Sequence, residues 1–190
     1  MRLVQAASAR APSLALAVGV AALVTCLPQV ALGTPNHAHL HYHIGVRAYA
    51  GTRHAAMLHL EASSEGLDPV LARENARDME RLATEILEQV NRLEEVMSPR
   101  EREAIASEVA GMKEHGAAAR RLSAELAGWI EEAGIIPEKG GAPRPVPPAL
   151  RERIAGRARV LFAEFSLVLA RHKEAEKKLS IPAPPDPPAP

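Results

Sequence analysis

The chain has 190 residues, and its 23 lysines and arginines are balanced by 23 aspartates and glutamates. This balance excludes the strongly basic surface on which nucleic-acid binding depends. Aromatic residues make up only 3% of the chain, so we expect a core built from aliphatic side chains.

Residues 1–33 are predicted to form a secretory signal peptide. Arg2 and Arg10 supply positive charge ahead of an apolar run over 14–24, and small residues precede a cleavage point after Gly33. The apolar run is shorter than the about 20 residues that span a bilayer, so we expect no membrane span in the mature chain. The protein is therefore expected to be exported, either to the periplasm or into the medium.

Cys26, the single cysteine of the chain, offers an alternative location. The letters "LVTC" that end at this residue resemble a lipoprotein cleavage box, and modification of Cys26 would anchor the protein to a membrane by lipid. If the signal peptide is instead removed after Gly33, the cysteine leaves with it. The mature chain then forms no disulfide, although export would permit one.

Two helices are predicted in the first half of the chain beyond the signal peptide. The first covers about 37–62 and contains Gly45 and Gly51, of which Gly51 is the place where we expect a bend. The second covers about 69–97, because Asp68 can cap a helix that Pro69 opens.

Two further helices are predicted in the second half. The third begins with "SPRE", in which Ser98 and Glu101 form a capping box, and it ends near Gly134. A connection rich in glycine and proline follows, and the fourth helix then covers about 149–179. Residues 181–190 are expected to be an extended proline-rich tail.

The fourth helix shows the helical period most clearly, and the fold follows from it. One face repeats with alternating steps of four and three residues. Four amphipathic helices of similar length predict an all-α protein, an antiparallel up-down four-helix bundle over 34–180. The repeating positions are Ile154, Ala158, Leu161, Phe165, Val168, His172, Ala175 and Leu179.

Histidines are the residues most suggestive of chemistry, since "HAHLHYH" at 37–43 contains four of the eight. On a helix, side chains four residues apart lie on one side and can share a metal ion. Imidazole combined with thioether favours late transition metals, copper above all, with nickel and zinc as further candidates. The candidate metal ligands are His39, His43, His54, His115, His172, Met57 and Met112.

In a bundle of this topology, the position of a residue in its helix determines its height along the bundle axis. His43 lies six residues from the start of the first helix and His172 seven from the end of the fourth. An antiparallel arrangement therefore puts both about 10 Å from one end of the bundle, where we expect them to share an ion. His54 and His115 fall at a second common height, with methionines within a turn.

Three functions are compatible with these patterns. The first is a periplasmic metal-binding bundle that buffers, senses or delivers copper, nickel or zinc. The second is a helical adaptor or scaffold with incidental histidines, for which the proline-rich tail and a periplasmic protein partner would matter. The third is a bundle that binds b-type haem through His43 and His172, although the scarcity of aromatic residues argues against haem.

Enzymatic activity is not expected. The sequence contains no P-loop, dinucleotide-binding fingerprint, nucleophile elbow or HExxH pattern. It also lacks the Glu-x-x-His pair of di-iron bundles.

Overall fold

The computed structural model describes residues 37–137 and 141–181. The predicted signal peptide, Cys26 and the tail beyond Ile181 lie outside these residues. Every regular element in the described ranges is a helix, which confirms the prediction of an all-helical bundle. The helices are α2 (His37–Ala62), α3 (Pro69–Val96), α4 (Pro99–Ala104), α5 (Ala106–Glu132) and α6 (Pro148–Leu179).

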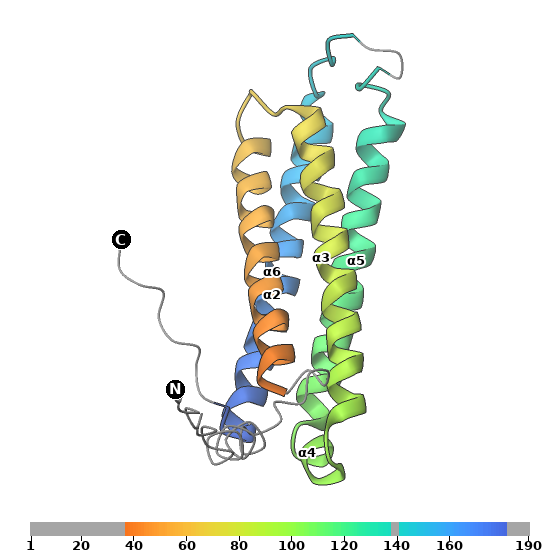
Figure 1. Cartoon of the computed structure of the whole chain (residues 1–190). Helices are drawn as coiled ribbons and strands as arrows, with labels where there is room; N and C mark the ends of the chain where they lie inside the picture. Colours follow the sequence, from red (N-terminus) through yellow and green to blue (C-terminus); the bar gives the residue numbers. More distant parts are fainter. Residues whose placement is uncertain (1–36, 138–140, 182–190) are drawn as a thin grey trace, which may run out of the picture. The chain divides into compact units, whose positions relative to one another are not determined.

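The four long helices pack side by side. Helix α2 contacts α3 and α6, and α5 contacts the same two helices from the other side. In Figure 1, α2 and α5 run upward while α3 and α6 run downward, so the beginning of α2 and the end of α6 lie at the same end. Two helical segments that are far apart in the sequence are thereby brought together.

Helices α3 and α4 begin at the capping residues that the sequence predicts. Asp68 accepts hydrogen bonds from the backbone N–H groups of Val70 at 2.8 Å and Leu71 at 3.3 Å. Ser98 and Glu101 form the predicted capping box. These side chains satisfy backbone donors that would otherwise lack partners in the first turn of each helix.

The structure divides the predicted third helix into α4 and α5. The division falls at Ile105, whose backbone leaves helical geometry with φ −120° and ψ 20°. The Ile105 side chain is fully buried, and the hydrogen bonds from Ile105 N to Glu101 O and from Val109 N to Ile105 O persist across the break. The break is therefore a local distortion at a residue that the core holds in place.

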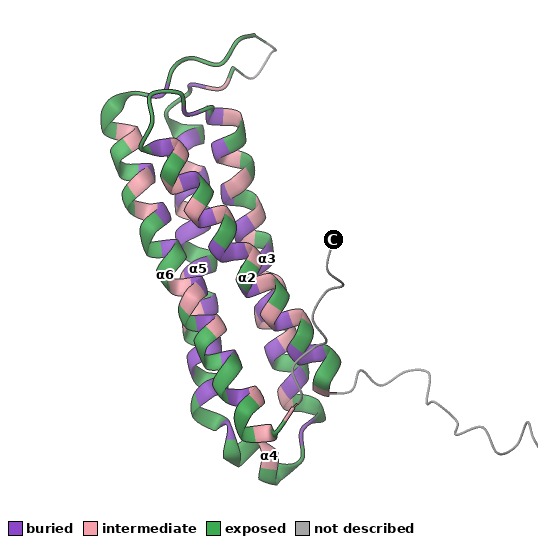
Figure 2. Cartoon of the chain, turned by 90° about the vertical axis from the view of Figure 1, so that its left-hand side faces the viewer, coloured by how far each residue is buried: buried purple, intermediate pink, exposed green. Residues whose placement is uncertain are grey.

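The core is aliphatic, as the composition predicts, and Figure 2 shows buried residues along the inner faces of the long helices. Phe165 on α6 is the largest fully buried side chain. It packs where Gly51 lacks a side chain, since a Cβ atom on Gly51 would lie 2.4 Å from Cδ1 of Phe165. Helix α2 continues through Gly51, and this glycine permits close packing of α2 against α6.

Within residues 37–137 and 141–181, none of the helices combines the length and the apolar character that spanning a membrane requires.

Candidate metal centre

His41 points from α2 into the bundle and is fully buried. It belongs to the inward-facing stripe of α2, in which steps of three and four residues alternate. That stripe consists of His41, Ile44, Ala48, Gly51, Ala55, Leu58 and Ala62, all of which are buried. The helical period therefore places an imidazole where a hydrophobic side chain would be expected.

His172 occupies the matching position on α6 and is only 3% exposed. Its ring packs against the backbone of α2 at Gly45, because a Cβ atom there would lie 2.9 Å from Cε1 of His172. Gly45 thus makes the room that the His172 ring needs. The prediction that His172 lies in the bundle core is confirmed.

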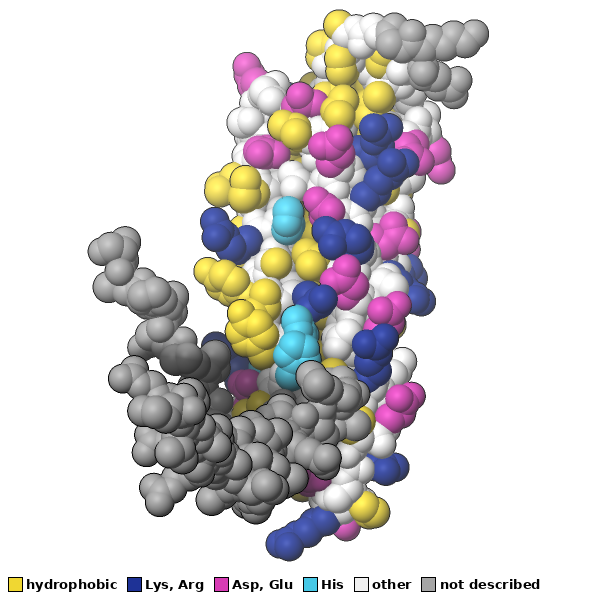
Figure 3. All heavy atoms as spheres, viewed as in Figure 1, with side chains coloured by type: hydrophobic (Ala, Val, Ile, Leu, Met, Phe, Trp, Pro, Cys, Tyr) yellow, Lys and Arg dark blue, Asp and Glu magenta, His cyan; other side chains and the backbone are white. Residues whose placement is uncertain are grey.

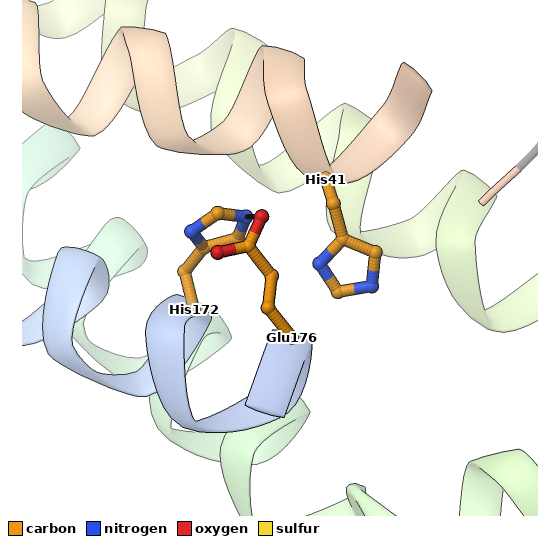
Figure 4. A group of neighbouring side chains, drawn as sticks. All are labelled: His41, His172 and Glu176. Atoms are coloured by element: carbon orange, nitrogen blue, oxygen red, sulfur yellow. Dashed lines mark ion pairs between the residues drawn. The ribbon is translucent and has the colours of Figure 1, made fainter. Parts of the chain in front are cut away.

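Glu176 completes a group of three side chains. It follows His172 by one helical turn, and its Oε1 lies 3.5 Å from Nε2 of His172. The ring centroids of His41 and His172 are 5.3 Å apart, and one ligand atom from each of the three residues lies within 4.8 Å of the others. Figure 4 shows the three side chains directed toward one another from α2 and α6.

The two imidazoles are short of hydrogen-bond partners. Both ring nitrogens of His41 and both of His172 are buried without a hydrogen bond. Polar groups removed from water normally retain a partner, because an unsatisfied one costs about 1 to 3 kcal/mol. Four such nitrogens in one place are therefore unusual for a purely structural cluster.

The electrostatics favour neutral imidazoles. Burial, with a smaller contribution from the neighbouring His172 and His37, lowers the pKa of His41 to about 4. Burial likewise lowers the pKa of His172 to about 4, and the backbone of His41, which lies close but without hydrogen-bond geometry, opposes this only partly. Burial also raises the pKa of Glu176, against the effect of Lys173. At neutral pH both rings keep a free lone pair.

His43 does not face His172, which corrects the predicted pairing. The predicted height is nearly right, since His41 and His43 are about 3 Å apart along the axis, but two residues correspond to roughly 200° around the helix. His43 lies near the surface, with its Nε2 2.9 Å from Nε2 of His39 and its Nδ1 accepting a hydrogen bond from Arg47. These two histidines form a separate pair on the outside of α2.

The second predicted layer does not converge on one point. His54 donates to Oδ1 of Asn75 at 2.9 Å, and His115 donates to Oε2 of Glu164 at 2.9 Å. Met112 is fully buried in the hydrophobic core, whereas half of the Met57 surface is exposed. Among the described residues, the group of histidine, cysteine and acidic side chains that converges closely enough for a metal ion is His41, His172 and Glu176.

The sequence contained signals for the two residues that were missed. His41 lies in an alternation of three and four residues like the one that contains His172, whereas the "HAHLHYH" pattern by itself indicates only pairs along a single helix. Glu176 is one turn beyond His172, which is the spacing at which two side chains of one helix meet.

Comparison with protein-family models, with curated proteins and with solved structures finds no match for this chain.

Proposed function

We propose that this protein is an exported helical bundle that binds a transition metal ion through His41, His172 and Glu176, and that it buffers, senses or delivers that metal. The observation that carries the proposal is the pair of facing, buried imidazoles whose four nitrogens lack hydrogen bonds. A metal ion would take one nitrogen from each ring and the carboxylate oxygen beside them.

The protonation states support this assignment. A metal ion binds the neutral imidazole, so histidines with a pKa of about 4 need not release a proton at neutral pH. The carboxylate of Glu176 would compensate part of the ion's charge beside the two buried rings. Its raised pKa marks the cost of holding that negative charge without a cation.

The ligand atoms of the site narrow the choice of metal ion. Two imidazoles and one carboxylate suit copper(II), nickel(II) and zinc(II) better than calcium or magnesium, which prefer oxygen ligands. The thioether argument for copper loses its support, because Met57 is half exposed and Met112 lies in the apolar core. Copper(II) remains our first choice on affinity alone, since it forms the most stable complexes of the divalent series.

Three protein ligands also leave a coordination position open. Structural zinc sites usually close all four positions with protein side chains, whereas a site with three ligands can accept water or a donor from another molecule. An ion that can be exchanged through such a position suits buffering or delivery. It does not suit the role of a permanent structural staple.

Calorimetric titration of metal-free protein with copper(II), nickel(II) and zinc(II) tests the proposal. We expect one ion per chain, with at least about ten-fold weaker binding in His41→Ala and in His172→Ala. The double variant should lose little more than either single variant, because ligands of one ion are not additive.

Variants of the outer pair provide the control. His39→Ala and His43→Ala remove imidazoles from the same helix but leave the buried group intact. If binding disappears in these variants and persists without His41 and His172, the "HAHLHYH" segment acts as a surface chelator and the buried site is wrong. If no ion binds at all, the adaptor function becomes the better interpretation.

A further inference from the structure

An open groove of about 770 Å³ lies between α2 and α6, beside the three converging side chains. Its volume falls within the range of sites that hold small organic molecules. His172 and Glu176 form part of its wall. Two of the three proposed metal ligands therefore line the groove, which extends beyond them along α2 and α6.

The α2 side of the groove is apolar. Tyr42, Val46 and Tyr49 are 50%, 46% and 57% exposed, and their spacing of four and three residues puts them in one stripe along the helix. Figure 3 shows hydrophobic side chains gathered along the left-hand edge of the viewed face, over α2. Leu169 adds an apolar surface from α6. Contiguous exposed apolar side chains of this kind are typical of binding surfaces.

The α6 side of the groove is charged, and mostly positive. Lys173 and Lys177 lie one helical turn apart on its rim, with Glu176 as the one acidic residue among the described lining residues. Neither lysine forms an ion pair within the described part of the chain, where the carboxylate of Glu176 is instead close to His172. Two ammonium groups are thus available to an anion at the edge of an apolar surface.

We propose that this groove binds an amphipathic monocarboxylate, such as a medium-chain fatty acid. The hydrocarbon chain lies on Tyr42, Val46 and Tyr49, and the carboxylate lies between Lys173 and Lys177. The complementary pattern of charge and apolar surface carries this assignment, because a neutral ligand leaves both lysines unused and a cationic one is repelled by them. The proposal goes beyond metal binding and does not need a metal ion to be present.

Calorimetric titration of the metal-free protein with decanoate, below its micelle concentration, tests this site. Decanol and decylammonium serve as ligands of matched length with no charge and with opposite charge. We expect one decanoate per chain and at least about ten-fold weaker binding of decylammonium. Equal affinity for the three ligands would overturn the proposal, since it would show only a non-specific apolar surface.

Paired substitutions locate the ligand. Val46→Glu should weaken decanoate binding about ten-fold, whereas Leu71→Glu, at an equally exposed apolar position on α3, should not. Replacement of Lys173 and Lys177 by glutamate should abolish the preference for decanoate over decanol. Arg120→Glu, a charge reversal at an exposed position on α5, should preserve that preference. Unchanged binding in Val46→Glu would place the ligand elsewhere and refute the site.

Single variants distinguish the decanoate site from the proposed metal site. His41→Ala should retain decanoate binding while its metal affinity falls, and Val46→Glu should retain metal binding while its affinity for decanoate falls. Analytical ultracentrifugation identifies the competing occupant, a second copy of the chain. A dimer that Val46→Glu dissociates, in a protein that does not bind decanoate, would refute the small-molecule site.

Discussion

Replacing both His41 and His172 by leucine should make the metal-free protein much less sensitive to acid. Burial lowers the pKa of each histidine to about 4 in the folded protein, against about 6.5 in an unfolded chain. Between these values the unfolded state takes up protons that the folded state does not. Protonation of the two histidines therefore leaves the free energy of unfolding unchanged above about pH 6.5 and lowers it as the pH falls toward 4.

The size of the effect follows from these two pKa values. At pH 5 the unfolded state gains about 2 kcal/mol over the folded state for each histidine, or about 4 kcal/mol for the pair. Against a typical stability of about 5 to 15 kcal/mol, this loss is large. Glu176 acts in the opposite direction, because a raised pKa in the folded state favours folding as the pH falls, and it remains in the variant.

Urea unfolding in the presence of a chelator, at about pH 7.5 and pH 5, measures the difference. Trp129 provides the fluorescence signal, since it is the single tryptophan and its ring lies 4.0 Å and 4.7 Å from the guanidinium carbons of Arg153 and Arg157. The wild-type protein should lose about 4 kcal/mol more than the variant between the two pH values. An equal loss in both proteins would show that the two histidines are not buried as neutral rings.

Four further substitutions test the packing and the capping of the bundle. Gly51→Ala should destabilise the protein by about 1 to 3 kcal/mol in urea unfolding, because the new methyl group overlaps the buried Phe165 ring. Gly156→Ala serves as the control, because a methyl group at Gly156 on α6 has no neighbouring atom within 4 Å. It should stabilise the protein by up to about 1 kcal/mol. A gain in both variants would mean that α2 and α6 are farther apart than the structure shows. Met112→Ala should cost about 2 to 5 kcal/mol in thermal unfolding, since Met112 is fully buried, and a loss below about 0.5 kcal/mol, typical of surface positions, would contradict its place in the core. Asp68→Ala should cost about 1 kcal/mol through loss of two backbone hydrogen bonds at the start of α3, and unchanged circular dichroism melting would argue against that cap.

Local sequence rules predict much of this fold because the helices begin and end where those rules say. Asp68, Ser98 and the proline-rich connection mark their boundaries, and the step of four and three residues in α6 identifies His172 as a core residue. The break at Ile105 was not predicted, because it depends on how a buried side chain meets its neighbours, and the local sequence "REAIAS" contains neither glycine nor proline.

The candidate site was predicted less well, for a reason of geometry. Height along a bundle depends on residue number alone, and an error of two residues shifts it by only about 3 Å. The direction in which a side chain points turns by about 100° with every residue, so the same error moves it to the opposite side of the helix. Residue number therefore predicts the height of the site nearly correctly, whereas only the core register of α2 distinguishes His41 from His43.

The place of His41 in the first turns of α2 and of His172 in the last turns of α6 has a mechanical consequence. An ion held between them would join the beginning of α2 to the end of α6 at one end of the bundle, and would enclose almost all of the helical chain in one closed loop. Fraying of a helical bundle usually begins where its first and last helices end, and here the start of α2 and the end of α6 would be held by the same ion. A force that separates the start of α2 from the end of α6 would then have to release the metal before either helix could leave the bundle.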